Sequence, residues 1–240
     1  AIVTGGAGGI GSAVAEMFAR EGALVTVADI DISRAGEIAA TIEKAIAHEV
    51  DVTSAESVER LVAETVERRG RLDIMVNNAG IENPVVDILD MSDDAYLRTI
   101  AVNQNGCFYG IRAAGRAMRE NGGVIVNTAS VYGVLAARGQ VPYVASKAAV
   151  IAMTRAAARD LARYNIRVVA IAPGLVETPL SREFLADPRA WEAVERGHLR
   201  RKAARPDDIA RLATFLAGDE AAFLNGHVYF ADDGYATFKP

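Results

Sequence analysis

Short segments that are apolar at nearly every position alternate with helical patterns along the whole chain. Seven such segments can be recognised: 1–4, 23–30, a brief one that reaches 50, 72–78, 123–130, 166–173 and 226–232. Strands of this kind are buried on both faces, as in a parallel sheet with helices on either side. The alternation therefore predicts an α/β fold, with a single doubly wound domain over residues 1–240 and about seven parallel strands covered by helices on both faces.

Helical periodicity fills the stretches between these segments. Helices are expected at 10–20, about 33–45, from a cap at 54 onward, about 92–120 with a bend near 105–106, and about 141–164. Ser54 is the expected N-cap, because its hydroxyl can accept a hydrogen bond from a free N–H group of the first turn.

The composition argues against several classes of partner. Hydrophobic residues make up 51% and charged residues 24% of the chain, which is the balance of a globular protein with a sizeable core. The net charge of -5 argues against a nucleic-acid partner. No apolar run reaches the roughly 18 residues that a membrane span needs, so no membrane partner is expected.

Cysteine and histidine are sparse. Cys107 is the only cysteine, so no intrachain disulfide can form and a reducing, cytoplasmic location is expected. The three histidines, His48, His198 and His227, are far apart in the sequence, and no metal site is expected. The sequence starts inside a strand at Ala1, so a few upstream residues are expected to exist.

A glycine cluster, "GGAGGIG" at 5–11, joins the first strand to the first helix. Gly6, Gly8 and Gly11 fit the spacing G-x-G-x-x-G, and the segment also fits T-G-x-x-x-G-x-G from Thr4. Glycines allow a tight turn and let the backbone approach a pyrophosphate, which then sits at the positive end of the helix. This context favours a dinucleotide site over a merely flexible turn.

Asp29 closes the second strand, eighteen positions after Gly11. A carboxylate there can accept hydrogen bonds from the adenosine ribose and would repel a 2′-phosphate. Between Gly5 and Asp29 the only basic residue is Arg20, and Ile30 follows directly, so the site favours NAD over NADP. The alternative is a carboxylate that simply ends a strand or caps a loop.

The segment "YVASK" places Tyr143 and Lys147 four positions apart, on the same face of a helix. The pattern alone also fits two solvated residues on a surface helix. If the two side chains converge, the ammonium, together with the positive ring of an oxidised nicotinamide, is expected to lower the pKa of Tyr143 toward neutrality. General acid–base catalysis by the phenol would then be efficient.

Over almost its whole length the chain resembles the short-chain dehydrogenase/reductase family, a Rossmann-fold family. The motifs that carry the resemblance are "TGGAGGIG" at 4–11, "DVT" at 51–53, "NNAG" at 77–80, the asparagine of "AVNQNG" at 103, Ser130, "YVASK" at 143–147 and "PGLVET" at 173–178. Two features depart from the family pattern. Asp233 stands where a glycine is common in the last strand's "V-D-G-G" run, which puts subunit contacts in doubt, and "NQNG" is an unusual continuation after Asn103.

The resemblance implies a set of site residues. The catalytic residues would be Asn103, Ser130, Tyr143 and Lys147. The residues that bind the cofactor would be Gly5, Gly9, Ile10, Gly11, Asp29, Ile30, Asp51, Val52, Asn78, Ala79, Gly80, Tyr143, Lys147, Pro173, Gly174, Val176 and Thr178. In the family's chemistry the tyrosine exchanges the hydroxyl proton, the serine binds the substrate oxygen, the lysine binds the nicotinamide ribose, and the asparagine holds a water that links the lysine to solvent.

The resemblance also implies a substrate lid at about 175–202 and assembly into a homotetramer or homodimer. Phe184, Leu185, Trp191 and Val194 are expected to face the substrate, with further wall positions at 81–86, 131–135 and Arg138. The expected pocket is apolar and suits a secondary alcohol or ketone of modest size, with NAD as cofactor; Arg138 is the one side chain that could anchor an anion. Two alternatives are a 3-oxoacyl-thioester (acyl-carrier-protein) reductase and a non-catalytic dinucleotide-binding protein.

Overall fold

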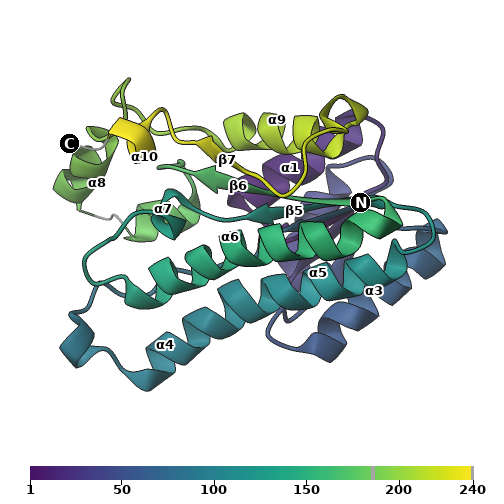
Figure 1. The fold of residues 1–240 in the computed structure, drawn as a ribbon, viewed down its shortest axis with the longest axis horizontal. Coiled ribbons are helices and arrows are strands. Elements are labelled where there is room, and N and C mark those ends of the chain that lie inside the picture. Colours follow the sequence, from purple (N-terminus) through teal and green to yellow (C-terminus); the bar gives the residue numbers. More distant parts are fainter. Residues whose placement is uncertain (185–186, 239–240) are drawn as a thin grey trace.

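Seven parallel strands form one sheet in the order β3-β2-β1-β4-β5-β6-β7 (Figure 1). The computed structural model describes residues 1–184 and 187–238. The strands are β1 Ile2–Thr4, β2 Thr26–Asp29, β3 Ile46–Glu49, β4 Ile74–Asn77, β5 Gly123–Thr128, β6 Ile166–Pro173 and β7 Val228–Ala231. Every predicted strand is present, and the predicted doubly wound α/β fold is confirmed.

Helices cover both faces of the sheet, and Figure 1 shows α1 and α9 on one side and α4, α5 and α6 on the other. Their bounds are α1 Gly9–Arg20, α2 Ile32–Ala40, α3 Ala55–Arg69, α4 Asp93–Ile100, α5 Gly106–Ala117, α6 Val141–Leu161, α7 Pro179–Phe184, α8 Pro188–Glu195, α9 Pro206–Ala217 and α10 Tyr235–Phe238. Among these described helices, none combines the length and apolar character that crossing a membrane would need.

Neighbouring side chains along each strand enter opposite halves of the core. Ile2 packs in the cluster that contains α3, α5 and α6, whereas the next residue, Val3, packs in the cluster that contains α1, α2 and α9. Met75 and Val76 of β4 divide in the same way. This alternation explains why the strands are apolar at nearly every position, since each face must be covered.

Two helix predictions need correction. The helix predicted at about 33–45 ends at Ala40, because the hydroxyl of Thr41 bonds to the carbonyl oxygen of Ile38 and Lys44 turns to a φ of 61°. The long helix predicted at about 92–120 is divided by a π-helical turn, Ala101–Asn105, rather than by a simple bend. Ser54 caps α3 as predicted, accepting a hydrogen bond of 3.2 Å from the N–H of Ser57.

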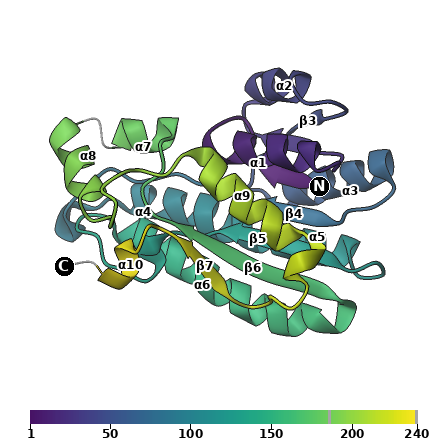
Figure 2. The same ribbon diagram turned by 90° about the horizontal axis from the view of Figure 1, so that it is seen from above.

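Both views place α7, α8 and α10 at the same end of the molecule, beyond the carboxyl ends of β5 and β6 (Figures 1 and 2). The two ends of the segment that carries α7 and α8 are joined to each other by backbone hydrogen bonds. There Glu177 donates a backbone hydrogen bond to Ala204, and Ala204 donates one to Leu175. Ligands of open α/β sheets bind at this end of the strands, so the fold directs attention there.

Candidate active site

A cavity of about 420 Å³ opens at the carboxyl ends of the strands. Its walls come from the loop after β1, the end of β2, the segments after β4, β5 and β6, the first turns of α6, and the α7–α8 and α10 segments. Residues that are remote in the sequence therefore meet in one space. Of the predicted site residues, those that line it are Gly5, Gly9, Ile10, Asp29, Asn78, Ala79, Gly80, Ser130, Tyr143, Lys147, Pro173, Gly174, Val176 and Thr178.

The glycine loop leaves the N-terminus of α1 open to this cavity. Gly5 and Gly9 have φ values of 63° and 56°, which glycine adopts without strain. Gly8, at the N-cap, offers no side chain to the free N–H groups of the first turn. A Cβ atom on Gly9 would meet Thr178 at 3.3 Å, in the space that a bound group would share. Bare N–H groups at the positive end of a twelve-residue helix suit a pyrophosphate, so the loop fits a dinucleotide.

Gly11 is needed for packing rather than for binding, because a Cβ atom there would collide with the carbonyl oxygen of Gly5. Its hydrogen side chain allows α1 to pack against the loop. Asn78 completes the same unit by donating from its amide to the carbonyl oxygens of Thr4 and Gly5, at 3.1 and 3.2 Å. The "NNAG" segment thus joins the ends of β1 and β4 beside the cavity.

Asp29 is held by two backbone groups. Its carboxylate accepts hydrogen bonds from the N–H of Ala7 at 3.0 Å and of Asp31 at 3.1 Å, while the side chain lines the cavity. The carboxylate therefore caps its loop, and its remaining lone pairs face the space where a ribose would lie.

Arg34 also bears on the choice between NAD and NADP. It lines the same part of the cavity, and its guanidinium nitrogen is 3.4 Å from the position of a Cβ atom on Gly8. Arg34 lies five positions after Asp29, outside the segment from Gly5 to Asp29, and the first turn of α2 brings it to the cavity.

Ser130, Tyr143 and Lys147 converge on the cavity. Ser130 follows β5, and its side chain is near enough to the phenol of Tyr143 to lower its pKa. Lys147 is buried one helical turn after Tyr143, with Nζ 5.6 Å from the centre of the phenol ring and 2.9 Å from the carbonyl oxygen of Thr128. The two residues of "YVASK" are therefore not solvated residues of a surface helix.

Burial and, next, the carboxylate of Glu82 raise the pKa of Tyr143 above 10, and the Ser130 side chain opposes them. Burial also lowers the pKa of Lys147 to about 8, against the fields of Cys107 and Glu82. Without cofactor the pKa of Tyr143 is therefore raised, because the phenolate is removed from water. The lowering by Lys147 together with an oxidised nicotinamide stays a prediction.

Asn103 lies in the π-helical turn and is buried just behind the cavity lining. Its side-chain oxygen accepts from the N–H of Ile81 at 2.8 Å, and its amide donates to the carbonyl oxygen of Ile81 at 2.9 Å and to Ser146 at 3.2 Å. A Cβ atom on Gly80 would lie 3.4 Å from the Asn103 oxygen and 3.5 Å from Nζ of Lys147. Both polar atoms therefore lie beside Gly80, at the edge of the cavity.

Three other predicted cofactor residues lie outside the cavity lining. Ile30 is 69% exposed. The carboxylate of Asp51 accepts from the N–H and the hydroxyl of Thr53, at 2.9 and 2.7 Å, and Val52 packs against Gly106. Their part in binding a cofactor stays a prediction.

The predicted substrate walls are partly correct. Val194 lines the cavity together with Leu180, whereas Trp191 does not, and Arg138 is exposed outside it. Arg138 is therefore not positioned to anchor an anion. Leu185 lies outside the described residues, and the side chain of Phe184 is also not described.

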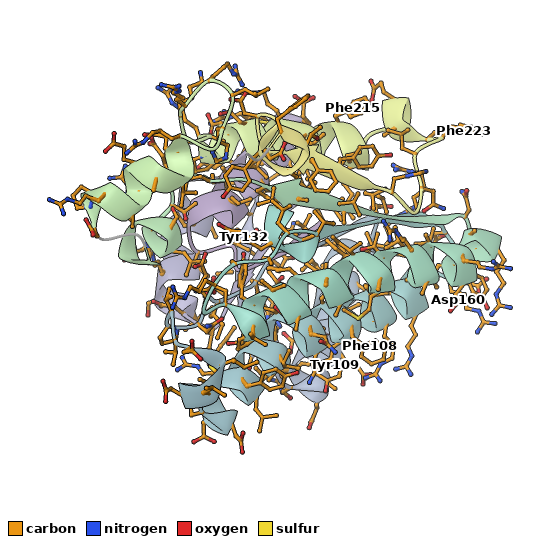
Figure 3. The ribbon with its side chains drawn as sticks, turned by 60° about the vertical axis from the view of Figure 1, so that its left-hand side comes forward. Phe108, Tyr109, Tyr132, Asp160, Phe215 and Phe223 are labelled. Carbon is orange, nitrogen blue, oxygen red and sulfur yellow. The ribbon has the colours of Figure 1, made fainter. Side chains whose placement is uncertain are left out.

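Besides Arg34, the polar side chains that line the cavity and that sequence reasoning missed include Glu82, Tyr132, His198 and Tyr235. Glu82 and Tyr132 fell inside predicted wall segments, but their polarity was overlooked. Tyr132 lies inside the molecule on the side of α7 and α8 (Figure 3) and forms a hydrogen bond with Tyr235. No local sequence signal could bring Tyr235, near the C-terminus, to this place. The predicted apolar pocket is thus wrong on this side.

His198 is buried, and both of its ring nitrogens have polar partners. Its Nε2 accepts from the N–H of Leu175 and its Nδ1 lies 3.1 Å from the carbonyl oxygen of Val194, while its ring lies 4.8 Å from that of Tyr235. In the described part of the chain, no three His, Cys, Asp or Glu side chains gather as a metal site.

Comparisons with known proteins agree with this geometry. The family model described as enoyl-(acyl carrier protein) reductase matches residues 5–236. The 3beta-hydroxysteroid dehydrogenase 2 of Eggerthella lenta is 36% identical over 99% of this chain and 95% of its own length. Cyclopentanol dehydrogenase of a Comamonas species is 36% identical over 98% and 96%, and the 3-oxoacyl-[acyl-carrier-protein] reductase of Thermotoga maritima 36% over 97% and 96%.

Solved structures are similar over nearly their full lengths. The crystal structure of gox2181 superposes with a TM-score of 0.96 at 36% identity and covers 99% of this chain and 95% of that one. A 3-ketoacyl-(acyl-carrier-protein) reductase from Brucella melitensis, complexed with NADH, superposes with a TM-score of 0.92 at 30% identity, covering 98% and 97%.

Proposed function

The chain belongs to the short-chain dehydrogenase/reductase family, and from this premise we propose that it is an NAD-dependent oxidoreductase that interconverts a secondary alcohol and a ketone. Members of the family bind a nicotinamide dinucleotide and act on CH–OH groups of small molecules. The observation that carries the proposal is the convergence of Ser130, Tyr143 and the buried Lys147 on the cavity that the glycine loop enters.

Tyr143 is the proposed general acid and base. In alcohol oxidation it accepts the hydroxyl proton, and in ketone reduction it returns a proton to the carbonyl oxygen. Ser130 donates a hydrogen bond to the same oxygen as negative charge develops there. When bound in its oxidised form, the nicotinamide supplies the hydride acceptor and a positive charge near the phenol.

Lys147 and Asn103 have supporting roles in the proposal. Lys147, fixed by Thr128, binds the nicotinamide ribose and contributes a positive field. Asn103, with its oxygen near Lys147, holds a water that lets the lysine exchange protons with solvent. Both roles follow the family pattern, and the position of both polar atoms beside Gly80 supports them.

Different residues are proposed to bind the different parts of the dinucleotide. The first turn of α1, with Gly9 and Ile10, takes the pyrophosphate, and Thr178 lies beside it. Asp29 takes the adenosine ribose hydroxyls. NAD is proposed over NADP because this carboxylate would repel a 2′-phosphate. The relative solved with NADH supports this choice, and Arg34 opposes it.

The proposed substrate is a neutral secondary alcohol or its ketone, of a size that fits beside the nicotinamide. Two relatives are named for secondary alcohols on rings, cyclopentanol and a 3beta-hydroxysteroid, which supports an alicyclic substrate. The segment at about 175–202, joined at its base by the bonds of Ala204, is the proposed lid over this substrate within a single domain of residues 1–240.

A 3-oxoacyl-thioester reductase is the second candidate, because the Thermotoga relative carries that name at the same identity. It would use the same catalytic residues, and Arg34 would suit the 2′-phosphate of NADPH. A non-catalytic dinucleotide-binding role is disfavoured, because Ser130, Tyr143 and Lys147 are together in one cavity.

We also propose that the chain assembles as a homotetramer, or as a homodimer, in the cytoplasm. Phe108 on α5 and Phe215 on α9 are each almost half exposed, and Phe223 is fully exposed. Figure 3 places Phe108 on a different side of the molecule from Phe215 and Phe223. Two separate aromatic surfaces are what two different subunit contacts would require.

The test of the proposed activity is NADH formation with a panel of cyclopentanol, cyclohexanol, 1-phenylethanol and 2-butanol, run beside NADPH oxidation with acetoacetyl-CoA. The proposal predicts NAD-dependent oxidation of at least one alcohol with higher kcat/KM than thioester reduction. Efficient thioester reduction with NADPH alone would favour the second candidate, and no turnover of any compound would contradict both.

A further inference from the structure

Glu82 lines the cavity beside the proposed catalytic residues, yet the proposed chemistry does not use it. Its carboxylate acts electrostatically on Tyr143 and Lys147 of α6 and on Tyr132, which follows Ser130. It is therefore a neighbour of the place where the reacting carbon would lie.

The backbone on both sides of Glu82 is held in place. Ile81 is bound through its N–H and its carbonyl oxygen by the side chain of Asn103. Asn83 is buried; its side-chain oxygen accepts from the N–H of Tyr143 at 3.3 Å, and its carbonyl oxygen accepts from Gln140 at 3.2 Å. Glu82 is thus fixed to the two elements that carry proposed catalytic residues, so its position relative to the reacting groups is set in advance.

The carboxylate of Glu82 has no hydrogen-bond or ion-pair partner within residues 1–184 and 187–238. Burial raises its pKa to about 7, although Lys147 opposes that shift. Glu82 is partly buried and its carboxylate faces the cavity, so a donor brought there takes the place of water on an acceptor that is otherwise unpaired. Among the described residues no side chain supplies such a donor, so a ligand in the cavity can supply it.

The cavity also contains a second polar feature, the hydrogen-bonded pair of Tyr132 and Tyr235. Its apolar walls, such as Leu175, Val194 and Leu180, belong to the lid segment. A ligand that matched this cavity would be apolar toward the lid and would carry polar groups toward Glu82 and the tyrosines.

We propose that Glu82 accepts a hydrogen bond from a second hydroxyl group of the substrate, so that the enzyme selects neutral diols or polyols over the matching mono-alcohols. This inference rests on the proposed function and names its substrate class. Glu82 is in this account a specificity-determining residue rather than part of the proton transfer.

The charges around Glu82 favour a neutral hydroxyl group over a charged one. A substrate carboxylate would be repelled by ionised Glu82, and a substrate ammonium would be repelled by Lys147 and by an oxidised nicotinamide. A hydroxyl group avoids both penalties and forms a charge-assisted hydrogen bond.

The test measures binding without turnover, in the presence of NAD, to the Tyr143→Phe variant. Calorimetric Kd values for cyclohexanol and for its 1,2-, 1,3- and 1,4-diols are compared in this background alone, with added Glu82→Leu, and with added Asp90→Asn. Asp90 is an exposed carboxylate of the same segment, outside the cavity lining, and is the matched control.

The proposal predicts that at least one diol binds about tenfold more tightly than cyclohexanol, a ratio that Glu82→Leu abolishes and Asp90→Asn leaves unchanged. Equal binding of all four compounds, or a ratio that survives Glu82→Leu, would overturn it. If the leucine variant does not fold, Glu82→Gln takes its place. The proposal then requires that the preference for the diol over cyclohexanol falls by at least about threefold. Oxidation of the same alcohols by the unmodified enzyme tests the proposed function separately.

Discussion

Nζ of Lys147 lies 5.6 Å from the centre of the Tyr143 ring but donates its hydrogen bond to the carbonyl oxygen of Thr128. The lysine is thus anchored to the end of β5, and in the proposed mechanism it acts on the phenol through its field. Ser130, from the segment after the same strand, lines the same cavity and lowers the pKa of Tyr143. Thr128 and Ser130 therefore join the end of β5 to the two site residues that α6 delivers.

Lys147→Met should lower kcat/KM for alcohol oxidation by about a hundredfold and move the acidic limb of its pH profile, where activity rises with pH, to higher pH. Loss of the positive field makes the phenolate harder to form, and an opposite charge close by is worth one or more pKa units. Lys147→Arg, which keeps the charge, should show a smaller movement of that limb. An unchanged pH profile in the methionine variant would show that the lysine only binds cofactor.

Glu82→Gln should stabilise the folded protein at high pH. At low pH the same substitution should give a much smaller gain in stability. In the folded state the pKa of Glu82 is raised from 4.5 to about 7, so the folded protein holds this proton where the unfolded chain has lost it. The resulting stability is complete below pH 4.5 and is lost as the pH rises through 7.

The gain from Glu82→Gln should therefore be about 2 kcal/mol larger at pH 8.5 than at pH 5.5, measured by urea unfolding of the cofactor-free protein. Tyr132, Tyr143 and Lys147, the other groups that face Glu82, are present in both proteins and titrate above this range or near its upper end. Asp90→Asn, at an exposed carboxylate, should show no such dependence. An equal gain at both pH values would contradict the assignment.

Arg34→Gln tests whether Asp29 or Arg34 decides the choice between NAD and NADP. If Asp29 dominates, the unmodified enzyme prefers NAD, and removal of the guanidinium beside Gly8 should increase that preference by about tenfold through loss of residual NADP activity. The ratio of kcat/KM for NAD and NADP is the measurement. A preference for NADP in the unmodified enzyme would contradict the assignment from Asp29.

Gly110→Ala should destabilise the protein by about 1–3 kcal/mol. A Cβ atom there would collide with the side-chain amide of Asn77, which bonds at 2.8 Å to Asn127 and through it to Thr154, joining β4, β5 and α6. Gly36→Ala is the matched control: it lies in α2 with nothing near the added atom and should stabilise by about 0.5–1 kcal/mol. Equal melting temperatures for the two variants would contradict this account of the packing.

The sequence predicted the strands and the main motifs because these are local signals. The seven strands and the glycine loop each show in a few consecutive residues, and the pair Tyr143 and Lys147 shows in five. Arg34 was not predicted because it lies beyond the end of β2, and only the turn into α2 returns it to the cavity.

Properties that depend on distant contacts were not predictable. The raised pKa of Tyr143 results from burial and from Glu82, sixty-one positions earlier, and the hydrogen bond between Tyr132 and Tyr235 spans most of the second half of the chain. The π-helical turn that presents Asn103 to Ile81 also depends on a partner twenty-two positions away. Periodicity in a helix contains no such information.

The most direct test of the central claim is the turnover of Tyr143→Phe at saturating NAD and alcohol, with NADH binding measured by fluorescence titration on the same sample. The account predicts that kcat falls by at least about a thousandfold, since the proton acceptor is lost, while the Kd for NADH changes by less than about threefold. Retained turnover with normal NADH binding would contradict the assignment of Tyr143 as the group that exchanges the proton.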